Sequence, residues 1–256
     1  MALRNTILLL LILPSIGCFR DNVRELWSSS AKPNTGPVAN GTGPATGPNG
    51  AVELPNKQSA ELCLKMAESL EAEGKDADAV PYYEKARLLD TSWHDRVSRR
   101  LAVVYDRLDE QSRAMKEFQD QLQKYPKDSV LLCDIGYSYY NRGQWTEAEN
   151  HLRKAISQDK SNKRAWVNLG MALAQQNKTN EALEAFEKGV TAAEARSNLA
   201  FILAVRGKTE EAKQAYRAAL QLEPALNLAR IALNKLENPE AAKNAKVQTA
   251  GASEAE

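Results

Sequence analysis

Residues 163–190 read KRAWVNLGMALAQQNKTNEALEAFEKGV, and their spacing predicts the fold. The small residue Gly170 comes twelve places before Ala182, and the large apolar residue Phe186 comes four places after that alanine. Asn177, between them, tolerates the left-handed backbone that often ends a helix. The stretch therefore predicts two helices joined by a turn, with small residues where the helices cross.

The same arrangement recurs along the chain, with steps of 35, 34, 34 and 30 residues. The recurring alanines are Ala79, Ala114, Ala148, Ala182 and Ala212, and the large residues four places later are Tyr83, Phe118, Leu152, Phe186 and Tyr216. Twelve places before the alanines stand Ala67, Ala102, Gly136, Gly170 and Ala200. A period near 34 residues is typical of a stacked helix-turn-helix array, which favours a binding surface over a catalytic pocket.

Turn and cap residues agree with this period. Residues that tolerate a left-handed backbone stand at every expected turn, namely Gly74, Asp109, Gly143, Asn177 and Gly207. Capping boxes are predicted at Thr146 with Glu149 and at Thr191 with Glu194. The second box follows Gly189 almost at once, because the last step is only 30 residues. We expect this short step to change the tilt between the last two repeats.

Two repeats carry a fuller motif. The fourth has Trp166, Leu169, Gly170, Leu173, Ala182 and Phe186, and the fifth has Leu199, Ala200, Leu203, Ala212, Tyr216, Ala219 and Pro224. This pattern resembles the tetratricopeptide repeat. The resemblance implies an all-α fold over residues 57–238, a right-handed superhelical solenoid of about five helix-turn-helix repeats with a C-terminal capping helix.

Residues 1–18, MALRNTILLLLILPSIGC, have the features of an export signal. Seven apolar residues, Ile7 to Leu13, follow Arg4, which is too short a run to span a membrane. The segment resembles a bacterial lipoprotein signal, in which residues 1–17 are removed and Cys18 is diacylated. Phe19 in place of aspartate favours the outer membrane, facing the periplasm. The alternative is ordinary secretion with a free cysteine near the new terminus.

The regions that flank the array lack apolar periodicity. Residues 18–56 contain AKPNTGPVANGTGPATGPNG, which predicts a disordered tether, and residues 239–256 predict a disordered tail. The 34 basic and 33 acidic residues leave a net charge of +1, which does not indicate nucleic-acid binding. Two histidines and three cysteines are too few and too scattered for a metal cluster. We expect no metal and no cofactor.

The resemblance also implies that the first helix of each repeat lines a concave groove. The family's groove positions carry over to Arg96, Arg99, Val103, Arg107, Tyr137, Tyr140, Asn141, Arg164, Met171, Gln175 and Phe201, with Asn168 and Asn198 placed to hold a peptide backbone. An aromatic floor beside a basic wall suits an extended or helical peptide with acidic residues. The alternative is that these arginines and tyrosines only solvate and pack the helices.

The sequence contains no recognisable set of nucleophile, base and orienting group, so we expect no enzyme. Signal, tether and repeats together resemble the lipoproteins of tight-adherence (Flp) pilus assembly. They imply a membrane-tethered protein-binding scaffold of a bacterial envelope assembly or secretion system, held by its lipid anchor. A lipoprotein of the outer-membrane-protein assembly machine is the runner-up in this class. A structural or peptidoglycan-associated envelope lipoprotein is the competing hypothesis.

Overall fold

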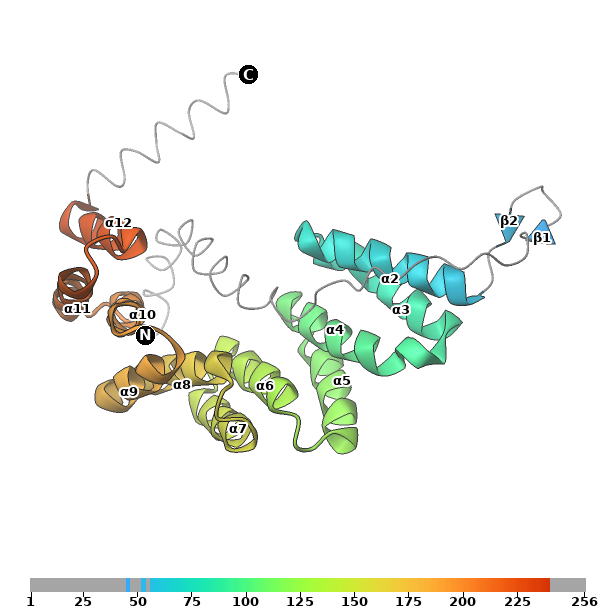
Figure 1. The fold of residues 1–256 in the computed structure, drawn as a ribbon, viewed down its shortest axis with the longest axis horizontal. Helices are drawn as coiled ribbons and strands as arrows, with labels where there is room; N and C mark the ends of the chain where they lie inside the picture. Colours follow the sequence, from blue (N-terminus) through green and yellow to red (C-terminus); the bar gives the residue numbers. More distant parts are fainter. Residues whose placement is uncertain (1–44, 47–51, 54–55, 240–256) are drawn as a thin grey trace, which may run out of the picture. The chain divides into compact units, whose positions relative to one another are not determined.

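The computed structural model describes residues 45–46, 52–53 and 56–239 (Figure 1). The predicted signal peptide, Cys18, most of the tether and nearly all of the tail lie outside these residues. Within the predicted tether, β1 (Ala45–Thr46) and β2 (Val52–Glu53) form an antiparallel pair in which Ala45 lies opposite Glu53. The remainder of the described chain is built from helices and the short connections between them.

Residues 56–239 form eleven α-helices, of which ten are arranged as five consecutive hairpins (Figure 1). The hairpins are α2 (Asn56–Ala72) with α3 (Asp76–Leu89), α4 (His94–Arg107) with α5 (Gln111–Lys124), α6 (Ser129–Asn141) with α7 (Trp145–Gln158), α8 (Lys163–Gln175) with α9 (Thr179–Gly189), and α10 (Ala192–Val205) with α11 (Thr209–Leu222). A 3₁₀ turn, η3 (Thr91–Trp93), precedes α4, and α12 (Asn227–Glu237) follows the last hairpin. The predicted fold class is confirmed.

The small residue of each hairpin lies where its two helices cross. A Cβ atom added to Gly136 would lie 2.6 Å from Cγ of Leu152, and one added to Gly170 would lie 2.6 Å from Cδ1 of Phe186. Carbon atoms in contact are normally about 3.5–4.0 Å apart, so these two crossings require glycine. The five recurring alanines and the large residues that follow them are all buried. The period in the sequence is therefore the period of helix crossings.

Each hairpin turns at a residue with a left-handed backbone. The φ angle is 77° at Gly74 and Gly207 and 72° at Gly143, and it is 61° at Asp109 and 65° at Asn177. Aspartate and asparagine adopt this region more readily than other residues with a side chain, because their short polar groups hydrogen-bond locally. The five predicted turn residues are confirmed.

One of the two predicted capping boxes forms. Thr191 Oγ1 accepts a hydrogen bond from the backbone N–H of Glu194, and the Glu194 carboxylate accepts one from the backbone N–H of Thr191. The box predicted at Thr146 and Glu149 is wrong, because Thr146 already lies inside α7 and no side chain caps the start of that helix. Glu149 instead accepts a hydrogen bond from Lys178 Nζ at 2.8 Å.

The short last step joins α9 to α10 almost without a loop. Helix α9 ends at Gly189. Only Val190 separates it from Thr191, which caps α10. A Cβ atom on Gly189 would lie 2.7 Å from Cγ2 of Val167 and 2.8 Å from the carbonyl oxygen of Lys163, so the end of α9 lies directly against the start of α8. The changed tilt at this junction stays a prediction.

Helix α12 closes the C-terminal end of the array. Ala229 and Leu233 are buried in one apolar cluster with Tyr216 of α11. Arg230 and Asn234, on another side of α12, are exposed. The exposed part of α12 is not purely polar, since Leu228 and Ile231 are 41% and 50% exposed.

Candidate functional site

The predicted groove residues lie on α4, α6, α8 and α10, the first helices of hairpins two to five. Neighbouring first helices contact one another, α4 with α6, α6 with α8, and α8 with α10. The structure therefore brings the predicted residues onto a row of adjacent helices. Their side chains fall into three groups, which are ion-paired arginines, residues buried between helices, and a half-buried surface of aromatic and amide groups.

The predicted basic wall is neutralised by neighbouring carboxylates. Arg96 pairs with Glu68 at 2.6 Å. Arg107 pairs with Glu71 at 2.8 Å and with Asp76 at 2.7 Å. Glu68 and Glu71 belong to α2, so these pairs join the first helices of hairpins one and two. Half-exposed ion pairs add little stability, but they reduce the positive charge that a ligand meets.

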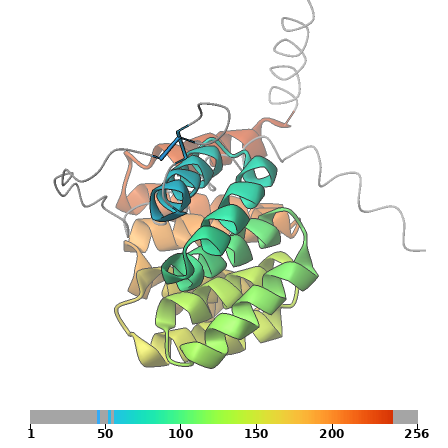
Figure 2. The ribbon, with the colours of Figure 1, turned by 90° about the vertical axis from the view of Figure 1, so that its right-hand side faces the viewer.

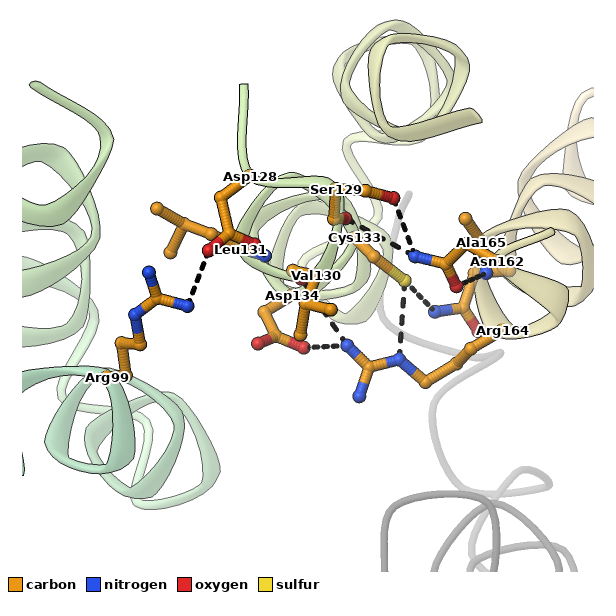
Figure 3. Close-up of polar contacts among 11 residues, drawn as sticks. Arg99, Asp128, Ser129, Val130, Leu131, Cys133, Asp134, Asn162, Arg164 and Ala165 are labelled. Atoms are coloured by element: carbon orange, nitrogen blue, oxygen red, sulfur yellow. Dashed lines mark hydrogen bonds and ion pairs between the residues drawn. The ribbon is translucent and has the colours of Figure 1, made fainter. Parts of the chain in front are cut away.

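Two more arginines bridge α4, α6 and α8 (Figure 3). Arg99 pairs with Asp128 at 2.6 Å, and Asp128 also accepts a hydrogen bond from the backbone N–H of Leu131, which caps α6. Arg164 on α8 pairs with Asp134 on α6. Burial raises the pKa of the Asp134 carboxyl to about 6, and the Arg164 guanidinium opposes this effect. The pair is therefore ionised at neutral pH.

Cys133 lies in the contact between α6 and α8 (Figure 3). Its sulfur accepts hydrogen bonds from Nε of Arg164 at 3.4 Å and from Nδ2 of Asn168 at 3.5 Å. Burial raises the pKa of the Cys133 thiol, so the neutral thiol predominates. Asn168 is only 2% exposed, and its amide is directed at the sulfur. This orientation differs from the predicted one, in which the amide holds a peptide backbone.

An aromatic surface spans α6, α8 and α10. Tyr137 and Tyr140 stack with their ring centroids 6.2 Å apart, and Gln175 Nε2 donates a hydrogen bond to the Tyr140 hydroxyl at 3.3 Å. Burial raises the pKa of Tyr140, which keeps the phenol protonated. Asn198 and Phe201 lie on α10, and all five residues are half-buried. We call these five residues the aromatic surface.

The other predicted residues contribute less to this surface. Met171 is buried on α8, Val103 packs against the core of the first two hairpins, and Asn141 is exposed at the end of α6. Sequence reasoning missed the carboxylates that pair with the arginines. The partners lie 28 to 36 residues apart, close to one repeat. Opposite charges at that spacing are the signal that would have found them.

The side chains on the first helices of the described chain are suited to binding. In the described part of the chain, no three side chains of His, Cys, Asp or Glu are placed to hold a metal ion. A search of the same residues for a helix long and apolar enough to cross a membrane finds none. The arrangement provides one stacked pair of tyrosine rings, Tyr137 and Tyr140, with amide and hydroxyl groups on the same and neighbouring first helices. Such groups can bind apolar side chains and exposed backbone groups.

Five stacked hairpins with a continuous row of first helices define a helical-repeat protein. Residues 133–198 match a family model described as tetratricopeptide repeat, and residues 193–226 match a second with the same description. Residues 133–226 are therefore tetratricopeptide repeats, which form a scaffold for protein interactions.

Two proteins of similar sequence match part of this chain. A TPR repeat-containing protein of Dictyostelium discoideum is 40% identical over 65 residues, which is 25% of this chain and 25% of the relative. The Photosystem I assembly protein Ycf3 of Prochlorococcus marinus subsp. pastoris is 30% identical over 81 residues, 31% of this chain and 47% of the relative. The chain thus spans a quarter of the length of the first relative and about half of the length of the second.

Solved structures share the fold at low sequence identity. A thermophilic TPR protein of Thermus thermophilus superposes with a TM-score of 0.54 at 17% identity, covering 69% of this chain and 98% of that chain. At this identity the likeness concerns the fold alone.

Proposed function

We propose that the protein is a membrane-tethered protein-binding scaffold of a bacterial envelope assembly or secretion system, with tight-adherence (Flp) pilus assembly as the system. The observation that carries this proposal is the aromatic surface on three neighbouring first helices. Aromatic side chains offer a large apolar area with a polar edge and lose little conformational entropy on binding. Such a surface suits an extended or helical protein segment.

The chemistry of the surface indicates what the partner presents. Apolar side chains of the partner would lie on the rings of Tyr137 and Phe201, and its backbone would meet the amide of Asn198. Acidic side chains would have to displace Asp128 or Asp134 from the groove arginines. Acidic side chains of the partner would therefore add less affinity here than they would beside arginines that have no carboxylate partner. We infer a largely uncharged, apolar partner segment.

Two observations support an assembly role at a membrane. The relative Ycf3, similar over 81 residues, is an assembly protein. Residues 1–18 resemble a lipoprotein signal, and two acyl chains are enough for stable anchoring. In this proposal Cys18 is acylated and held in the outer membrane, and the repeats face the periplasm.

Photocrosslinking in intact cells tests the binding surface. A photoreactive residue at Tyr137 or at Phe201 is expected to capture a defined protein partner. The matched control carries the same residue at Gln119, which is exposed on the second helix α5. Equal capture from Gln119, or no capture from the aromatic surface, would exclude this surface as the binding site.

Labelling with a palmitate analogue tests the tether. Cys18→Ser is expected to abolish the label and release the protein from membranes, because no thiol remains at the predicted acylation site. Cys63→Ser on α2 is the control and should keep both label and membrane association. A label that persists in the Cys18→Ser variant would contradict the lipid anchor.

A structural or peptidoglycan-associated envelope lipoprotein is the second candidate. The pairing of all four predicted groove arginines favours it, because such pairs stiffen a spacer without serving a ligand. Cosedimentation with purified peptidoglycan distinguishes the two functions. Binding that survives the double substitution Tyr137→Ser and Phe201→Ser would favour the spacer.

A further inference from the structure

The amide groups of the aromatic surface favour one conformation of the bound segment. Asn198 is half-buried on α10, and its amide can both donate and accept hydrogen bonds. Gln175 donates to the Tyr140 hydroxyl through Nε2, and its amide also has a carbonyl acceptor. A helical segment already pairs its own backbone N–H and C=O groups, whereas an extended segment presents them to its binding site. Half-buried amides beside the rings therefore favour an extended segment.

Among extended conformations, the aromatic surface fits polyproline II better than a β-strand. A β-strand pairs with the backbone of a sheet edge, and this surface consists of side chains on α-helices. In polyproline II the backbone is solvated, and each proline removes one N–H that would otherwise need a partner. Two amides are enough for such a segment, because few of its backbone groups require a partner in the protein.

The spacing of the rings also matches a polyproline II helix. Tyr137 and Phe201 each come directly after the small residue of their first helix, Gly136 or Ala200, so they occupy equivalent places in the array. Only α8 separates α6 from α10 in the row of first helices, which lies behind α2 and α3 in Figure 2. Packed helices are about 8–10 Å apart, which puts the two rings roughly 16–20 Å apart. Six residues of polyproline II span about 19 Å and complete two turns.

The charges beside the aromatic surface favour an uncharged segment. Arg164 on α8 pairs with Asp134 on α6, and Arg99 on α4 pairs with Asp128. A carboxylate on the segment would compete with these aspartates, and a cation would meet arginines that are already present. A neutral segment has neither cost.

We propose that the aromatic surface binds an uncharged segment of a partner protein in the polyproline II conformation, with two prolines six residues apart. This inference rests on the proposed function and names the chemistry of its partner. The prolines lie on Tyr137 and Phe201, and the backbone between them meets the amides of Gln175 and Asn198. The pyrrolidine ring is apolar and fixes the backbone, so little conformational entropy is lost on binding.

Fluorine NMR of the full-length chain labelled with 4-fluorophenylalanine tests this proposal. The probe is the acetylated and amidated peptide PAAPAAP, added up to about 5 mM, which exceeds a Kd of about 1 mM. The Phe201 resonance, assigned by its absence in Phe201→Leu, is expected to shift. The resonances of Phe118 and Phe186, which are 1% and 0% exposed, should not. The control peptide PPPAAAA has the same composition but no prolines six residues apart, and it should bind more weakly.

Matched variants locate the contact. Tyr137→Ser is expected to weaken binding of PAAPAAP about tenfold, because one ring contact is lost. Asn198→Ala should also weaken it, because the peptide backbone loses a hydrogen-bond partner. Tyr82→Ser removes a tyrosine that is 39% exposed on the second helix α3 and should leave binding unchanged. Unchanged resonances of Phe118 and Phe186 show that each variant is folded.

An unshifted Phe201 resonance, an equal shift with PPPAAAA, or undiminished binding to Asn198→Ala would overturn the proposal. An uncharged helical peptide, AAQAAAAQAAAAQAA, separates its failure from that of the proposed function. If this peptide shifts Phe201 and PAAPAAP does not, the surface binds a partner helix and only the polyproline II inference is wrong. If neither peptide binds and photocrosslinking captures no partner, the proposed function is wrong as well.

Discussion

Substitution of Gly170 by alanine tests the close helix crossing that defines the hairpins. The added methyl group would lie 2.6, 2.7 and 2.8 Å from Cδ1, Cε1 and Cγ of Phe186. Phe186 is fully buried, so its ring cannot move into solvent, and the two helices must separate. Overpacking a core lowers the free energy of unfolding by about 1–3 kcal/mol. Alanine in place of a glycine inside a helix raises it by about 1 kcal/mol. Because three ring atoms clash, we expect a net loss of about 1–2 kcal/mol in the free energy of unfolding.

Urea unfolding followed by circular dichroism and tryptophan fluorescence measures this loss. Phe186→Leu removes ring atoms, so the double variant with Gly170→Ala should lose less than the sum of the single variants. Gly143→Ala is the control, because its added Cβ meets no atom within 4 Å and its cost arises from a φ of 72°. A Gly170→Ala variant about 1 kcal/mol more stable than the parent, as helix propensity alone predicts, would refute the close crossing.

Three further outcomes are expected from urea unfolding. Thr191→Ala removes the capping box of α10 and should cost about 1 kcal/mol, whereas Thr146→Ala, where no box forms, should change stability by less than about 0.5 kcal/mol. Asp128→Ala removes both the cap of α6 and the partner of Arg99 and should cost about 1–2 kcal/mol, while Asp128→Asn keeps the cap and should cost less. The pKa of Asp134, about 6 in the folded protein, exceeds the roughly 3.9 of an unfolded chain, so the folded state holds this proton more tightly. The contribution of Asp134 to stability is therefore greatest below about pH 4 and declines as the pH rises through about 6. Asp134→Asn should remove that decline, and an unchanged pH dependence would contradict the raised pKa.

The hairpins and their turns were predictable because the interactions that define them are local and recur. Gly170 and Phe186 are sixteen residues apart, and their contact repeats in every hairpin, so spacing alone reveals the crossing. A left-handed turn at Asn177 depends on that residue's own backbone preference. Neither feature requires knowledge of how the hairpins stack.

The capping boxes show where local reasoning fails. Thr191 and Thr146 each precede a glutamate by three residues, but only Thr191 stands at a helix start. Helix α7 begins before Thr146, and the Glu149 carboxylate accepts a hydrogen bond from Lys178 instead of capping the helix. A short motif identifies residues able to cap a helix, and the surrounding packing selects the ones that do.

Sequence periodicity is sufficient to establish the all-α array, the five hairpins and the row of first helices, because a crossing of two helices needs small and large residues at set distances along the chain. The state of the arginines depends on tertiary structure, since Arg99 and Arg164 are neutralised by carboxylates about one repeat away that stacking brings within reach. The exposure of Leu62 and Met66 is also a tertiary property. Leu62 and Met66 occupy the same positions as buried residues in later hairpins, and they are exposed because no described helix packs in front of α2.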